Sequence, residues 1–199
     1  MYYLSNSIQK LIFYVQTLFR YKFYSDVAII GGYYDSPKEL EVITIGKYFV
    51  TCVNQTIPNV PRKSHGLQGA QLPNGNLLVC GGAKCFHDRW RIGMDIEKHG
   101  EYHLFKLGYE HWTKVGTMKW ARVYHASVFY EGSLYTTGGL DPANNVISHH
   151  EEFSINGDVR EKKRLPIALQ GHTATMFDQH TMLICGGSKG RKFEGVSIF

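Results

Sequence analysis

The sequence predicts an all-β fold, a β-propeller of about four four-stranded blades. A short hydrophobic run ends in a glycine doublet at four places along the 199 residues. The first glycines of the doublets are Gly31, Gly81, Gly138 and Gly186, so the intervals are 50, 57 and 48 residues. A repeat of about 50 residues is typical of propeller blades, each of which is one supersecondary unit. Helical patterns are scarce after residue 25.

The doublets have a physical explanation. They are Gly31-Gly32, Gly81-Gly82, Gly138-Gly139 and Gly186-Gly187. A run rich in Val, Ile, Leu and Tyr that ends in glycine predicts a buried strand. Glycine at that end admits a positive φ and allows a neighbouring backbone to come close. In a ring of radiating sheets the inner strands are crowded, and glycine suits that position.

Further strand patterns keep step with the doublets. A histidine lies upstream of three of them, at His65, His125 and His172, and each begins another short strand pattern. Turns such as Asn74-Gly75 join that strand to the doublet strand. Alternating segments follow the doublets, at residues 40–45, 102–107 and 150–155. An outer strand at 110–115 then carries Trp112, so that each unit has four antiparallel strands.

At these residues the sequence resembles the kelch family. The resemblance depends on the glycine doublets, on Arg-x-x-His at Arg62/His65 and Arg122/His125, and on the Tyr109…Trp112 pair. It covers roughly residues 25–199. The other units depart from this pattern: Val50 and Arg160 stand where the second unit has Trp112, and Leu169 replaces the arginine before His172. One unit is therefore close to the family pattern and the others are degenerate.

The repeats divide the chain into an N-terminal segment, 1–24, and a propeller, 25–199. We expect repeats at approximately 25–60, 61–120, 121–168 and 169–199, the last of them incomplete. The resemblance implies about five to seven blades, within a general range of about four to eight. The chain is either a fragment of a larger propeller, which we favour, or a small four-bladed ring. An unclosed ring leaves strand edges bare.

The N-terminal segment does not fit the repeat. We expect residues 10–16 to be an outer or first strand of the first blade, and the alternative is a degraded signal or an artefactual start. The segment is too short and too charged to span a bilayer. The net charge is +5, yet the basic residues are scattered and accompany no nucleic-acid module. We therefore expect a solvated surface and no nucleic-acid partner.

The four cysteines do not decide whether the protein is cytoplasmic or secreted. Cys80 and Cys185 precede doublets and are expected to be small buried hydrophobic residues. Cys85 could form a disulfide with Cys80 or with Cys52, and the sequence does not choose between these pairings. A cytoplasmic protein is expected if the cysteines are free. A secreted protein is expected if Cys52, Cys80 or Cys85 form a disulfide, and the sequon at Asn54 would agree with it.

The ten histidines do not form a recognisable metal or catalytic pattern. His149 and His150 are adjacent, so on a strand they point to opposite faces. Cys80, Cys85 and His87 lack the paired spacings of a zinc site. His65, His125 and His172 repeat in register, which favours a structural role at blade junctions. We expect no catalytic residue, no metal and no cofactor, since nucleotide and hydrolase motifs are also lacking.

The expected function is therefore that of a non-catalytic protein–protein interaction module, as the kelch resemblance implies. Loops that follow the doublets concentrate binding function in such a repeat. The longest, 83–98, supplies the candidate partner-binding residues Lys84, His87, Arg89, Trp90 and Arg91. Trp and Arg are favoured at interface hot spots, although Trp90 could instead fold back on its own blade. The alternative is an enzyme or metal-dependent domain, for example one that resembles kelch-like copper oxidases.

Overall fold

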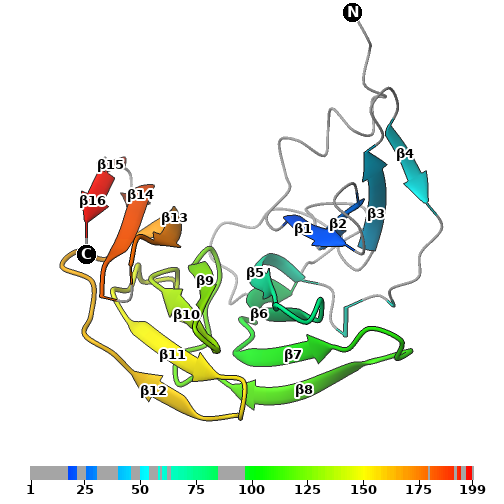
Figure 1. Cartoon of the computed structure of the whole chain (residues 1–199). Helices are drawn as coiled ribbons and strands as arrows, with labels where there is room; N and C mark the ends of the chain where they lie inside the picture. The colour runs from blue at the N-terminus through cyan, green and yellow to red at the C-terminus, as the bar shows by residue number, and fades with distance from the viewer. Residues whose placement is uncertain are drawn as a thin grey trace, which may run out of the picture.

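The structure is a computed structural model, shown in Figure 1. It describes four strand backbones between Leu18 and Val53, then Pro58, residues 60–61, 64–84, 97–178 and 180–190, and two short strands within 192–198. Every regular element in these residues is a β-strand. The prediction of an all-β fold is therefore confirmed. No helix in the part of the chain that the structure describes is long and apolar enough to cross a bilayer.

The strands form four antiparallel sheets, which we number in chain order. Sheet 1 contains β1 (Leu18–Tyr21), β2 (Asp26–Ile30), β3 (Leu40–Ile45) and β4 (Val50–Val53). Sheet 2 contains β5 (Ser64–Gln71), β6 (Leu77–Lys84), β7 (Glu101–Phe105) and β8 (Trp112–Thr117). Sheet 3 contains β9 (Ala126–Tyr130), β10 (Ser133–Thr137), β11 (His150–Ser154) and β12 (Val159–Glu161). Sheet 4 contains β13 (Gln170–Met176), β14 (Met182–Lys189), β15 (Lys192–Phe193) and β16 (Val196–Ile198).

Sheets 1 to 3 are simple meanders, in which each strand pairs with the next one along the chain. Sheet 4 differs, because β15 and β16 both pair with β14. They occupy one strand position at two places along β14, so sheet 4 has three strand positions. Sheets 2, 3 and 4 follow one another along an arc in Figure 1, and β5, β9 and β13 lie beside one another.

The strands follow one another in the predicted order, but some of them begin or end at other residues than predicted. The third strand of sheet 1 covers 40–45 as predicted, whereas β8 begins at Trp112 rather than at residue 110. β6 and β14 continue past their doublets, because Ala83 and Lys84 still pair with β5 and Ser188 pairs with Gln170. Sheet 1 begins at Leu18, inside segment 1–24; the predicted strand at 10–16 lies outside the described residues.

Apolar side chains hold neighbouring sheets together. Between sheets 2 and 3, Leu78, Tyr102 and Leu104 pack with Leu134 and Phe153 in one buried cluster. The rings of Tyr102 and Phe153 stack across this junction with centroids 4.0 Å apart. A second cluster between sheets 3 and 4 is formed by buried residues and by half-buried ones packed on them. It includes Val128, Tyr135, Leu169, Met182 and Ile184.

Each of these two junctions also contains one histidine of the repeat. His125, directly before β9 of sheet 3, places Nε2 3.5 Å from Cys80 Sγ of sheet 2. His172 of sheet 4 places Nε2 2.8 Å from Thr137 Oγ1 of sheet 3. Cys80 and Thr137 are equivalent, since each directly precedes a doublet. The same contact is therefore made twice, once with a thiol and once with a hydroxyl.

The first glycine of the doublet makes room for this histidine. Gly81 has φ +65°, and a Cβ there would lie 2.4 Å from His125 Cε1 and 2.8 Å from Arg122 O. Gly138 is equivalent, and a Cβ there would lie 2.7 Å from His172 Cε1. At Gly186 φ is +68°, yet no atom of the described residues lies within 4 Å of the Cβ position. Gly81 thus needs both its backbone angle and its lack of a side chain.

We expect Gly81→Ala to destabilise the protein more than Gly186→Ala does. Both substitutions force alanine into the left-handed region, at a cost of about 1–2 kcal/mol. Only Gly81→Ala adds a collision with His125 and with the Arg122 backbone. The extra cost should be about 2 kcal/mol. Urea unfolding of the two variants measures the difference, and equal midpoints would show that the histidine does not need this space.

Candidate functional site

The connections after the doublets of sheets 2 and 3 and the linker between these two sheets meet at one edge. Arg122 O accepts a hydrogen bond from Gly82 N at 2.9 Å, and Arg122 N donates to His99 O at 3.2 Å. Val123 forms an isolated β-bridge with Leu140, which lies in the connection between β10 and β11 of sheet 3. Residues 97–100, 118–125 and 138–149 therefore lie side by side, and we call this edge the loop face. It draws on segments from two sheets.

The predicted partner-binding loop leaves the loop face from a closed base. Lys84 N donates to Glu97 O at 2.9 Å, and Ala83 pairs with Lys98. Lys84 is exposed, with Nζ 3.7 Å from Glu97 Oε2. The structure thus places Lys84 at the root of the loop. His87, Arg89, Trp90 and Arg91 lie outside the described residues, as does Cys85.

A buried lysine connects the base of this loop to the next sheet. Lys98 is only 9% exposed, and its Nζ donates to Asn144 Oδ1 at 2.7 Å. The same Nζ lies 3.4 Å from Pro142 O. Asn144 has φ 64° and sits in a tight turn closed by bonds between Asp141 and Asn145. The post-doublet loops of sheets 2 and 3 are thereby joined into one surface.

A fully buried ion pair lies beneath the same surface. Arg122 Nη2 lies 2.7 Å from Glu151 Oε1, and neither side chain is exposed to solvent. Arg122 also donates to three carbonyl oxygens, those of Trp120, Gly138 and His149. Burial lowers the pKa of Arg122 and raises that of Glu151, and the attraction within the pair opposes both shifts. The pair therefore stays charged only because each partner is present.

Glu151 also fixes the linker between sheets 2 and 3. Its two oxygens accept hydrogen bonds from Lys119 N at 3.3 Å and from Trp120 N at 3.0 Å. Sequence reasoning selected Arg122 from the Arg-x-x-His pattern but missed Glu151, which is 29 residues away. The available signal was a glutamate in a strand pattern, at the second residue of segment 150–155. Arg62, the equivalent of Arg122 in the preceding unit, lies outside the described residues.

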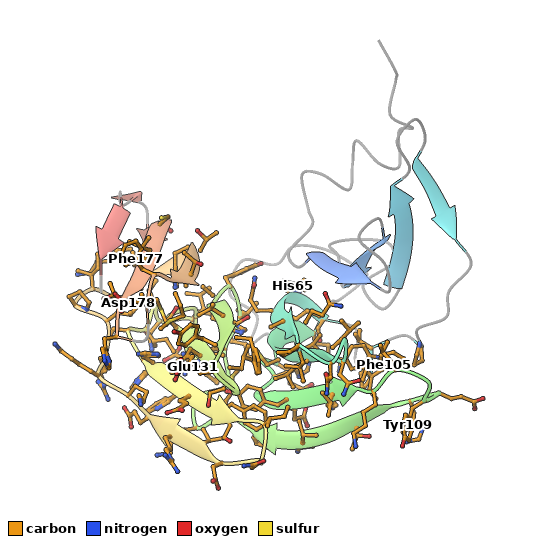
Figure 2. The ribbon with its side chains drawn as sticks, in the orientation of Figure 1. His65, Phe105, Tyr109, Glu131, Phe177 and Asp178 are labelled. Atoms are coloured by element: carbon orange, nitrogen blue, oxygen red, sulfur yellow. The ribbon has the colours of Figure 1, made fainter. Side chains whose placement is uncertain are left out.

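Trp120 is a surface residue that sequence reasoning also missed. The residue is 38% exposed, and its ring stacks on His149, with centroids 3.9 Å apart and an angle of 15°. The available signal was a tryptophan in the linker, two residues before the arginine of Arg-x-x-His. Tyr109 and Trp112, in contrast, do not form a common site. Trp112 is buried and donates to Pro58 O, whereas Tyr109 is 57% exposed on the β7–β8 turn, away from the loop face (Figure 2).

Cys80 is a free thiol in the structure, so the possible bridge from Cys80 to Cys85 is not formed. Burial raises the pKa of the Cys80 thiol, which keeps it protonated beside His125. Cys185 is also free and is partly buried. Only the backbone of Cys52 is described. A pairing of Cys52 with Cys85 stays a prediction.

The described residues contain no group of three or more His, Cys, Asp or Glu side chains that could hold a metal ion. His149 and His150 are both buried and touch different rings, those of Trp120 and Tyr135. A pocket beside sheet 2 is lined by residues that include Leu67, Val79 and Cys80, and its volume is about 20 Å³. That is room for about one water molecule. This pocket is too small for an organic cofactor.

Comparisons with known proteins fit this architecture. No protein-family model matches the sequence. Beta-scruin of Limulus polyphemus, a kelch protein, is 27% identical over an alignment of 104 residues, and the match covers 48% of this chain and 11% of beta-scruin. The structure of YjhT, a kelch-repeat protein, matches with a TM-score of 0.68 and 10% identity. That match covers 94% of this chain and 64% of the YjhT chain.

These findings place the chain in a fold class: it has an all-β fold that matches part of a kelch propeller structure. The chain is distantly similar to beta-scruin in sequence and its fold is similar to that of YjhT, which confirms the resemblance read from its doublets and histidines. It spans about a tenth of beta-scruin and less than two thirds of YjhT. The blade number of the complete propeller stays a prediction.

We expect Arg122→Met to destabilise the protein by about 3–5 kcal/mol, because Glu151 would remain as an unpaired buried charge. Glu151→Gln should cost less, since an amide oxygen can still accept from the linker backbone. Urea unfolding measures both. Arg160→Met is the matched control, because Arg160 is exposed on the outer strand of the same sheet. An equal loss for Arg122→Met and Arg160→Met would contradict the role of the buried pair.

We expect stability to fall as the pH drops below about 6.5. Burial lowers the pKa of His172 to about 4, and that of His125 well below its usual value. A histidine that is neutral when folded stabilises the protein fully above its unfolded pKa, about 6.5, and loses this contribution as the pH falls. For His172 alone the loss should reach about 1 kcal/mol at pH 5.5.

Urea midpoints measured between pH 7.5 and 5.5 test this expectation. His172→Gln should flatten the profile, because the variant no longer takes up a proton at this junction on unfolding. His111→Gln is the control, since His111 is exposed on the β7–β8 turn. A His172→Gln profile parallel to that of the wild type would rule out the contribution of His172.

Proposed function

We propose that the protein is a non-catalytic protein–protein interaction module, in which a propeller of about four or more blades presents its loop face to a partner protein. The observation that carries this proposal is the bond from Lys98 Nζ to Asn144 Oδ1 at 2.7 Å. It joins the loop bases of two neighbouring sheets into one continuous surface. A surface that is fixed before binding loses little conformational entropy when a partner docks.

The division between inner and outer side chains at the loop face supports the same proposal. The polar groups that hold it together are buried: Lys98, Arg122 and Glu151 are each less than a tenth exposed. Lys119 and Trp120, in contrast, are exposed residues. Such a surface suits recognition of another macromolecule, in which exposed anchors contact the partner and buried bonds hold their positions. The partner-binding residues that we propose in the loop are Lys84, His87, Arg89, Trp90 and Arg91.

We expect Trp90→Ala combined with Arg91→Ala to abolish partner binding and to leave the unfolding midpoint unchanged. Both residues belong to a loop whose base is closed by Lys84 and Glu97, so the sheets should fold without them. The measurement is capture of the natural partner by the wild type, followed by the affinity of the double variant for it. Tyr109→Ala, on the far turn of sheet 2, is the matched control.

Unchanged affinity of the double variant would exclude the loop as the binding element. Metal analysis of the purified wild type tests the proposal against the alternative of a metal-dependent function. Stoichiometric copper, iron or zinc would favour an enzyme or metal-dependent domain on the same scaffold.

A further inference from the structure

Trp120 is held in place on the loop face before any partner arrives. Its backbone N donates to Glu151 Oε1 at 3.0 Å, and its backbone O accepts from Arg122 Nε at 3.0 Å. The ring stacks on His149, and 38% of the residue remains exposed. Both backbone contacts lead to the buried ion pair. An aromatic side chain fixed in this way has little conformational entropy to lose on binding, which is the property of an interface anchor.

Two exposed basic residues belong to the segments around this anchor. Lys119 precedes it in the linker and is exposed. The segment after β12 lies along the start of β11, because Leu165 N donates to Ser148 O at 2.9 Å. That contact brings exposed Arg164 toward His149, and the Arg164 charge helps to lower the pKa of His149. Trp120 therefore has one exposed cation next to it in the linker, Lys119, and a second, Arg164, near the His149 ring on which it stacks.

One carboxylate partly balances this positive charge. Glu161 Oε1 lies 3.5 Å from His149 Nδ1 and 3.5 Å from Arg164 Nη2. Exposed ion pairs of this kind contribute little to stability. Arg164 can therefore exchange Glu161 for a carboxylate of a partner at little cost in free energy. A cationic segment could stack on Trp120, but Lys119 and Arg164 would repel it. The surface thus favours an anionic segment with an apolar residue.

We propose that Trp120, Lys119 and Arg164 anchor an acidic peptide segment of the protein partner. An apolar or proline side chain of that segment packs on the open face of Trp120, and its carboxylates bind Lys119 and Arg164. This inference rests on the proposed function and names the chemistry of the partner. It places the anchor in the linker between sheets 2 and 3, apart from the loop that contains Trp90.

The probe is a peptide selected from a random phage-displayed library on the immobilised wild-type protein. The enriched sequences should contain Asp or Glu beside an apolar residue. Binding of one synthetic, fluorescent peptide is then measured by anisotropy at two salt concentrations. We expect Trp120→Ala to weaken binding about tenfold or more and Trp120→Phe to weaken it much less. Lys119→Glu combined with Arg164→Glu should weaken binding about tenfold and remove its salt dependence.

Lys106→Glu is the matched charge control, because Lys106 is exposed on the β7–β8 turn, at the other end of sheet 2. Unfolding midpoints show whether each variant is folded. If Trp120→Ala does not fold, Trp120→Phe still tests the role of the ring.

Enrichment of basic or uncharged peptides, or of none, would overturn the inference. So would an acidic peptide that binds Trp120→Ala as tightly as the wild type. If that peptide instead fails to bind the Trp90/Arg91 double variant, the interaction module stands and only the Trp120 anchor is lost. Failure of the proposed function is a separate result, since it is measured by capture of the whole partner protein.

Discussion

The contact between Arg122 and Glu151 determines the geometry of the loop face. Two charges without solvent exposure, 2.7 Å apart, are tolerated only when each has its partner and its remaining hydrogen bonds. Arg122 uses those bonds to hold carbonyls of sheet 3, and Glu151 uses them to hold amides of the linker. The linker cannot shift without leaving a buried charge unpaired. The position of the linker then determines where β9 begins and where Trp120 lies on the surface.

Apolar and polar contacts contribute differently to the junction between sheets 2 and 3. Stacking of Tyr102 on Phe153 and the surrounding cluster supply most of the buried apolar area, but such contacts are not directional. The directional contacts lie toward the loop face, where His125 meets Cys80 and Arg122 meets Glu151. Packing therefore brings the sheets together, and the polar groups fix their register at the end where loops are displayed.

Sequence periodicity was enough to predict most of the strands that follow residue 25, because each depends on a local pattern, but it did not predict β1. The third strand of sheet 1 was predicted to the residue, and Gly81 and Gly138 were identified as sites of close approach. Contacts between distant residues were not predictable in the same way. Lys98 and Asn144 are 46 positions apart, and neither belongs to a repeated motif. Trp120 was missed because its exposure depends on a fold that only pairing between sheets creates.

The closed base of the long loop has a consequence for how the surface can change. Because Lys84 and Glu97 are hydrogen bonded to each other and Ala83 pairs with Lys98, the chain returns to its starting point before it re-enters the sheet. Closing a longer loop costs only slightly more entropy than closing a shorter one. The segment between these anchors is thus a natural graft position, where length and recognition sequence can be exchanged while the scaffold keeps its bonds.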